Sequence, residues 1–342
     1  MRPRIGPFAA AAVLLFGACS TDDDAGGEVD ATASVGCEQD EGDIAGGPRT
    51  LDHAGLERAY AVHLPDAYDG ETPAPMLFNL HGFGEDIESQ DAATDLPAEA
   101  GARGYVVVTP QGAPLSVPED TPQADDAAGF EGFAFWNFFG SAGIDFGGQP
   151  PPGLENVQPE DLGTDDVGFF AALTDTLLDD YCLDADRLFS TGMSNGAGMS
   201  TTLACELGER LRAIAPVAGV NLTGACAGDE PVPVRAIHGD ADSTASYGGN
   251  TLFDFELGNP SVPDRMTAWA DHNGCDSQPT VDDSVEGVVL TRWDGCDDDG
   301  VVELWTLTGW EHQWPRGPDA EPPAPIDATD VVLDFFDDVG AR

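Results

Sequence analysis

The sequence contains no lysine. All 13 basic residues are arginine, against 63 acidic residues, which gives a formal net charge of −50. A surface of this sign repels phosphate backbones and anionic membranes, so we expect no nucleic-acid partner. We interpret the charge as an adaptation to salt or to an acidic proteome, because acidic surfaces keep proteins soluble when salt screens repulsion. Attraction of cationic substrates is the alternative.

Clusters of metal-ligating residues are also absent. Among 7 cysteines and 6 histidines there is no CxxC pair and no Cys/His cluster, so we predict neither a metal nor a cofactor. The chain has no internal repeat, and no apolar run beyond the N-terminus could cross a bilayer. About 300 residues remain after the N-terminal segments, which suits one large domain.

The first 36 residues are typical of an export signal followed by a tether. Arg2 and Arg4 precede an apolar run from Phe8 to Phe16, as in a signal peptide. Phe16-Gly17-Ala18-Cys19 resembles the lipobox of bacterial lipoproteins; free secretion after cleavage is the alternative. We predict a signal peptide over 1–18, a lipidated Cys19 with a flexible acidic tether over 19–36, and the folded domain over 37–342. Membrane contact is expected only through the lipid.

Strand and helix signals alternate along the rest of the chain, which favours an α/β domain. Helices are predicted over 197–207, over 328–339, and after Thr164 or Asp165, either of which can cap a helix. Residues 113–163 form a long loop with an aromatic cluster that covers a cleft or packs on the domain. Strands are predicted over 57–64, 75–80, 104–110, 187–191, 211–217, 232–238, 288–293 and 301–307.

The segment Gly192-Met193-Ser194-Asn195-Gly196 is a G-x-S-x-G motif between a predicted strand and a predicted helix. The glycines permit a sharp turn that exposes the serine hydroxyl. The N–H groups at the start of the helix favour negative charge that develops there. We therefore predict that Ser194 is a nucleophile.

A serine hydroxyl needs a base to act as a nucleophile. His312 follows a late strand, and with this motif the base comes last in the chain, after the acid. Asp242 and Asp240 both follow an earlier strand; we prefer Asp242 as the acid that would orient the imidazole and stabilise its charge. A structural role is predicted for His81 and His238, which end strands, and a surface position for His272. His53 and His63 precede the core.

Two further groups of residues are candidates for the site. The backbone N–H groups of Asn195 and of Phe83, in the turn His81-Gly82-Phe83-Gly84, are predicted to form an oxyanion hole. Aromatic side chains could line a substrate site or pack in the core or rim. These are Trp136, Tyr247, Trp310 and Trp314.

Several segments, in order, resemble an esterase family that includes polyhydroxybutyrate depolymerase-like enzymes and feruloyl esterases of carbohydrate esterase family one. The elbow around Ser194 is similar to that of the family almost letter for letter. The resemblance implies an α/β-hydrolase fold, with a mostly parallel central sheet and helices on both faces, and supports Asp242 over Asp240. Trp310-Glu311 departs from the family pattern before the histidine, which leaves the substrate open. The other matching segments are Leu80-His81-Gly82, Asp165-Asp166-Val167-Gly168-Phe169, His238-Gly239 with Asp242, Tyr247-Gly248-Gly249 and His312-Gln313-Trp314-Pro315.

Apart from Cys19, the cysteines are even in number, which in an exported chain suggests disulfides. The resemblance implies a Cys275–Cys296 bridge. We pair Cys182 with Cys205, because both are expected at the end of the sheet far from Ser194. Cys37 and Cys226 then remain as the third pair.

These observations predict an exported serine esterase, with Ser194, Asp242 and His312 as its triad. Its partner is an ester substrate: a polyhydroxyalkanoate-type polyester, a feruloylated or acetylated polysaccharide, or a short acyl ester. One alternative is a serine peptidase of the same fold. Another is a non-catalytic envelope lipoprotein that binds carbohydrate or a partner.

Overall fold

Short apolar runs that are buried along their whole length form the centre of a large sheet. In β3 (Ala74–Leu80) and β4 (Val106–Pro110) every residue is buried, as expected for parallel strands that are covered on both faces. The computed structural model describes residues 31–38, 45–114, 132–138, 164–220, 226, 230–249, 251–252, 255–256, 260–297 and 300–341. The predicted signal peptide, Cys19 and most of residues 113–163 lie outside this part.

The main sheet has ten strands in the described part of the chain, in the order β1-β2-β4-β3-β7-β8-β9-β14-β13-β12. The strands from β4 to β14 in this order are parallel, and the flanking strands are antiparallel. The bounds of the other strands are β1 Gly47–His53, β2 Leu56–His63, β7 Leu183–Met193, β8 Ala213–Val217, β9 Val234–Gly239, β12 Thr280–Asp282, β13 Val288–Trp293 and β14 Val302–Leu307. Among the described residues, two small two-stranded sheets pair β5 (Ala113–Pro114) with β6 (Ala134–Phe135) and β10 (Thr251–Leu252) with β11 (Phe255–Glu256).

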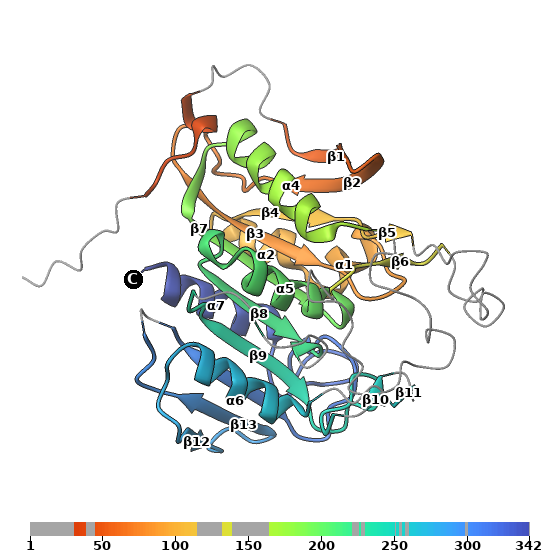
Figure 1. Ribbon diagram of the computed structural model, residues 1–342, viewed down its shortest axis with the longest axis vertical. Helices are drawn as coiled ribbons and strands as arrows, with labels where there is room; N and C mark the ends of the chain where they lie inside the picture. Colours follow the sequence, from red (N-terminus) through yellow and green to blue (C-terminus); the bar gives the residue numbers. More distant parts are fainter. Residues whose placement is uncertain are drawn as a thin grey trace, which may run out of the picture. The chain divides into compact units, whose positions relative to one another are not determined.

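Alternate residues of the central strands point to opposite faces of the sheet, where two hydrophobic clusters form. Met76 and Phe78 of β3 join the cluster that includes Phe170, whereas Leu77 between them joins the cluster that includes Phe336. The first cluster lies under α4 (Asp166–Asp180), α5 (Asn195–Glu206) and α6 (Val262–His272), which cover one face of the sheet (Figure 1). The second lies under α2 (Leu96–Ala102) and α7 (Ala328–Gly340) on the other face. The structure also contains α1 (Ile87–Thr94), η1 (Val35–Glu38) and η3 (Gly208–Arg210).

The predicted fold class is confirmed: the sheet is mostly parallel, with helices on both faces. Each predicted strand is present with shifts at its ends, and β7 is longer than predicted. Asp165 is the N-cap of α4, where its side chain accepts a hydrogen bond from Gly168 N–H, at 2.9 Å. In the described part of the chain, every helix is too short or too polar to cross a membrane.

Two of the three predicted disulfide pairings are wrong. The structure pairs Cys37 with Cys182 and Cys205 with Cys226, whereas the Cys275–Cys296 bridge is as predicted. The cause is the segment before η1, which runs beside the start of β7, where Ser34 N–H donates to Leu183 O at 2.9 Å. This contact brings Cys37 to Cys182, so that Cys205 pairs with Cys226 instead.

Because of the same segment, the folded domain begins earlier in the chain than the predicted start at residue 37. Residues 31–36, which are predicted to be part of the tether, belong to the compact unit that runs from Ala31 to Arg342. Ala33 forms an antiparallel bridge with Asp184, and the buried Ser34 hydroxyl donates to Tyr181 O at 2.7 Å. These contacts could not be predicted from the polar composition of the segment, because they are made by the backbone and by one hydroxyl.

Candidate active site

Ser194 lies in the turn between β7 and α5, in a strained backbone conformation. Its φ of 55° and ψ of −116° are rare for a residue with a side chain, and such strain is concentrated at functional sites. The two glycines of the motif are required by close packing. A Cβ on Gly192 would lie 2.5 Å from Leu80 O, and one on Gly196 would lie 2.2 Å from the same oxygen. The elbow is therefore held against the end of β3, next to the predicted oxyanion turn.

Asp242 and His312 come together after adjacent strands. β9 and β14 are parallel neighbours, so the loops that follow them leave the same edge of the sheet. Nδ1 of His312 lies 2.7 Å from Oδ2 of Asp242, whose side chain is fully buried, while His312 is partly exposed. β7, which carries Ser194, is parallel to these strands, so its elbow lies at the same edge.

Hydrogen bonds to both oxygens hold the Asp242 carboxylate in its charged form. Oδ1 accepts from the N–H groups of Thr244 and Ala245, each at 2.9 Å. Burial raises the pKa of Asp242, but the hydrogen bonds from His238 and His312 outweigh burial and hold the pKa well below its usual range. Asp242 therefore carries a full negative charge beside His312 across the neutral pH range.

The contact between His238 and Asp242 was not predicted from the sequence. Nε2 of the buried His238 lies 3.3 Å from Oδ2 of Asp242 and 2.8 Å from Ala245 O. Both neighbours are acceptors, so Nε2 carries the proton and donates, while the buried Nδ1 has no hydrogen-bond partner among the residues that the structure describes. The spacing of four residues in His238-Gly239-Asp240-Ala241-Asp242 was the available signal, but a His-Gly pair at a strand end is more often structural.

Asp240, the alternative acid, is placed elsewhere. Its exposed side chain accepts a hydrogen bond from Gly309 N–H at 2.6 Å, before the loop that carries His312. Of the two candidate acids, the one in contact with His312 is Asp242.

The predicted oxyanion turn is well defined around His81. Nε2 of His81 accepts from Gly112 N–H at 2.8 Å, so Nδ1 carries the proton and donates to Gly82 O at 2.7 Å. Burial lowers the pKa of His81 to about 4. His81 is therefore neutral at pH 7 and fixes the shape of the turn.

Two N–H groups of this turn are already in use. Gly82 N–H donates to Glu85 Oε2 at 3.0 Å, and Gly84 N–H donates to Ala134 O at 2.8 Å. The assignment of Phe83 as an oxyanion donor stays a prediction. Asn195 is the first residue of α5, where backbone N–H groups have no acceptor within the helix.

The four aromatic candidates fall into two groups. Trp136 and Trp314 are buried, and their indole N–H groups donate to His81 O at 3.0 Å and to Thr329 Oγ1 at 3.1 Å. Their burial favours the packing role. Tyr247 and Trp310 are half-buried, so they are the ones that remain predicted substrate contacts.

A cavity of about 350 Å³ lies away from these residues, at the opposite end of the sheet. It is lined by Tyr105 and Arg187, near the amino ends of β4 and β7, and by Phe336 of α7. Since Arg187 is paired with Asp184, the cavity offers no free cation from this side chain, and we assign it no role. Within the described residues no cluster of histidine, cysteine or acidic side chains could hold a metal ion.

Comparisons with known proteins agree with this fold. No protein-family model matches the chain. The chain is 27% identical over 260 residues to feruloyl esterase D of Neurospora crassa, covering 75% of this chain and 74% of that protein. It is 27% identical over 244 residues to feruloyl esterase C of Emericella nidulans, covering 70% of this chain and 71% of that protein.

A solved structure has the same fold. The acetyl xylan esterase from Aspergillus awamori aligns with a TM-score of 0.53 and 15% identity, covering 87% of this chain and all of that chain. The fold and the sequence relatives together define an esterase of the α/β-hydrolase type. The chain is accordingly a carboxylic ester hydrolase.

Proposed function

We propose that this protein is an exported serine esterase in which Ser194, His312 and Asp242 form the catalytic triad. The observation that carries the proposal is the 2.7 Å contact between His312 Nδ1 and the buried Asp242, at the sheet edge where the strained Ser194 elbow lies. The low pKa of Asp242 supports its role, because a charged carboxylate stabilises the imidazolium that forms during the reaction.

The reaction proceeds through an acyl-enzyme. Nε2 of His312 takes the proton of Ser194 as Oγ bonds to the ester carbonyl carbon, and the backbone N–H groups of Asn195 and Phe83 stabilise the resulting oxyanion. The C–O bond to the alcohol breaks, and His312 returns the proton to the departing alcohol. Water, deprotonated by His312, then attacks the acyl carbon, and the proton goes back to Ser194 as the carboxylic acid leaves.

The substrate class that we propose first is a feruloylated or acetylated polysaccharide. The support is that the sequence relatives are named feruloyl esterases, and that a bifunctional acetylxylan esterase/xylanase of Neocallimastix patriciarum is 24% identical over 244 residues, covering 70% of this chain and 29% of that protein. Polyhydroxyalkanoate-type polyesters and short acyl esters are the other candidates. Half-buried Tyr247 and Trp310 would contact the acyl group.

Export is part of the proposal, with lipidation at Cys19 as its anchored form. Three disulfides support an oxidising compartment, because such bridges are rare in reducing cytosol. A serine peptidase and a non-catalytic envelope lipoprotein remain the alternatives. The complete set of serine, acid and histidine argues against a non-catalytic protein.

The test is ester hydrolysis by the purified full chain and by Ser194→Ala. The substrates are p-nitrophenyl acetate and butyrate, methyl ferulate and a hydroxybutyrate oligomer, at low and high salt. We expect the variant to lose about 10⁴-fold or more in kcat, because the nucleophile is removed.

Ser277→Ala is the matched control, since Ser277 is an exposed serine far from the elbow in the sequence. It is expected to keep full activity. Folded wild-type protein without activity on any ester would contradict the proposal, and activity retained by Ser194→Ala would assign the reaction to another nucleophile.

A further inference from the structure

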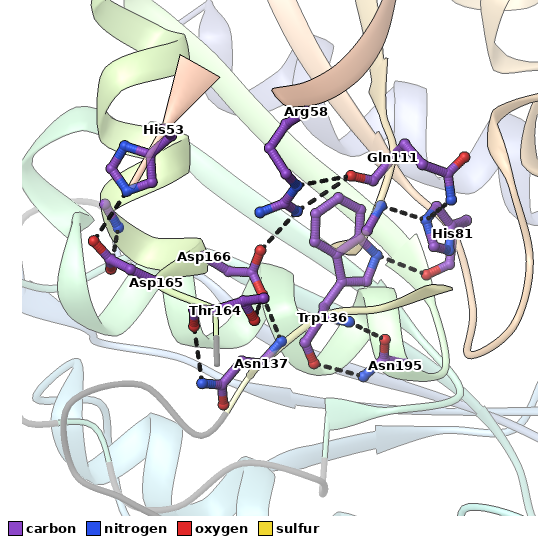
Figure 2. Close-up of polar contacts among 12 residues, drawn as sticks. His53, Arg58, His81, Gln111, Trp136, Asn137, Thr164, Asp165, Asp166 and Asn195 are labelled. Carbon is purple, nitrogen blue, oxygen red and sulfur yellow. Dashed lines mark hydrogen bonds and ion pairs between the residues drawn. The ribbon is translucent and has the colours of Figure 1, made fainter. Parts of the chain in front are cut away.

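The segment around Trp136 touches both sides of the proposed oxyanion hole. β6 ends at Phe135, and the residues that follow pass between the start of α5 and the turn after β3 (Figure 2). Trp136 is fully buried there. Its backbone and its side chain make different contacts, one to each side.

The backbone of Trp136 forms two hydrogen bonds with the side chain of Asn195. Trp136 N–H donates to Asn195 Oδ1 at 2.8 Å, and Asn195 Nδ2 donates to Trp136 O at 2.9 Å. The two hydrogen bonds run in opposite directions, so they fix the amide in one orientation. They also hold the first residue of α5, whose backbone N–H is a proposed oxyanion donor.

The side chain of Trp136 contacts His81, on the other side of the proposed oxyanion hole. Its indole Nε1 donates to His81 O at 3.0 Å, and the indole packs against the His81 ring with centroids 5.0 Å apart. His81 precedes the turn that carries Phe83, the second proposed donor. In Figure 2 the indole of Trp136 lies next to His81, and its backbone lies next to Asn195.

A buried ion pair anchors this segment. Arg58 donates to Asp166 Oδ1 at 2.8 Å, and Asp166 Oδ2 accepts from Asn137 N–H at 2.7 Å. The guanidinium of Arg58 also lies over the Trp136 ring, 5.6 Å from its centroid. Since Arg58 and Asp166 are buried, the residue after Trp136 is tied to the interior and not to solvent.

We propose that Trp136 is a positioning residue that sets the spacing between the two oxyanion donors. An oxyanion hole works only if its donors are already placed for the transition state, and small displacements are costly. One buried residue that bonds to one donor segment through its side chain and to the other through its backbone fixes their separation directly. This inference rests on the proposed serine esterase function.

Two variants test the two contacts separately, in the full chain. Trp136→Phe removes the indole N–H that holds His81 and keeps an aromatic ring. Asn195→Ala removes the two hydrogen bonds between the Asn195 side chain and the Trp136 backbone, and it keeps the backbone N–H that would bind the oxyanion. For each we expect kcat for p-nitrophenyl acetate to fall about 10- to 100-fold, with KM changed by less than about threefold. Binding of phenylboronic acid, which forms a tetrahedral anion on the serine, should weaken by a similar factor.

Trp269→Phe is the matched control. Trp269 is a buried tryptophan of α6 whose indole N–H has no hydrogen-bond partner among the described residues. Its replacement tests the effect of a smaller buried ring alone, and kcat should stay within about twofold of wild type.

The outcomes separate this inference from the proposed function. Wild-type activity that Ser194→Ala abolishes establishes the esterase, whatever the other variants do. Unchanged kcat and boronate affinity in either folded variant would then overturn the positioning role. An equal loss in Trp269→Phe would also overturn it, since packing alone would explain the effect. If Trp136→Phe does not fold, Asn195→Ala decides the inference. A folded wild-type protein without esterase activity would contradict both the proposed function and the positioning role of Trp136.

Discussion

At the residue scale, His81 links the stability of the protein to pH. In the folded protein its Nε2 accepts Gly112 N–H, and burial lowers its pKa to about 4 from 6.5. Between these values the unfolded chain binds a proton that the folded protein does not bind. Stability therefore rises with pH through this window and falls as the pH drops from 6.5 to 4.

We expect this one group to lower the free energy of unfolding by about 3 kcal/mol between pH 7 and pH 4. Urea unfolding at a series of pH values measures the loss. His81→Gln has no titrating group at this position, so its unfolding free energy should change less over the same window, apart from any constant destabilisation. Parallel pH profiles for the two proteins would rule out this role of His81.

The candidate site was largely predictable from the sequence at this scale. Ser194, His312 and Asp242 could be chosen because the serine motif, the chain order and the strand ends restrict the options. The contact of His238 with Asp242 could not be predicted, because it depends on how the loop after β9 folds back. The burial of Trp136 could not be predicted either, because an aromatic side chain is equally suited to a core and to a substrate site.

At the element scale, the bridge between Cys37 and Cys182 closes a sequence separation of 145 residues, and that between Cys275 and Cys296 one of 21. In the chain-entropy description, loss of the first costs about 5 kcal/mol and loss of the second about 3 kcal/mol. We therefore expect Cys37→Ala with Cys182→Ala to lower the free energy of unfolding more than Cys275→Ala with Cys296→Ala. Urea unfolding of the two double variants measures the difference. The opposite order would mean that local packing, and not loop length, governs these bridges.

Some elements could not have been predicted from apolar patterns. In α1 the buried residues are Gln90 and Thr94, and both are polar. They bond to Asn79 of β3, Gln90 Nε2 at 2.8 Å from Oδ1 and Thr94 Oγ1 at 3.2 Å from Nδ2. In β1 half-buried residues alternate with exposed ones and none is fully buried, so the strand carries little apolar signal. The central strands were predicted because their burial on both faces requires continuous apolar runs.

At the scale of the whole molecule, the net charge of −50 predicts a dependence of stability on salt. Two like charges about 10 Å apart in water repel by about 0.4 kcal/mol, and salt screens this repulsion. Because 63 acidic residues are balanced by only 13 arginines, we expect about 2 kcal/mol more unfolding free energy in 1 M than in 0.05 M sodium chloride.

Urea unfolding at several concentrations of sodium chloride measures this effect, with potassium chloride as the control. Screening depends on ionic strength, so the two salts should act alike. A stability that is independent of salt would show that repulsion is already balanced in the folded protein. A rise with only one cation would indicate specific binding instead.

The placement of the proposed triad after separate strands also has a consequence for folding. The proposed nucleophile Ser194 follows β7, the proposed acid Asp242 follows β9 and the proposed base His312 follows β14, so the site is complete only after the second half of the sheet has assembled on the first. Contacts this distant in the chain form late and slowly. Recovery of esterase activity during refolding should therefore lag behind the return of helical signal, and would report completion of the sheet and not collapse of the chain.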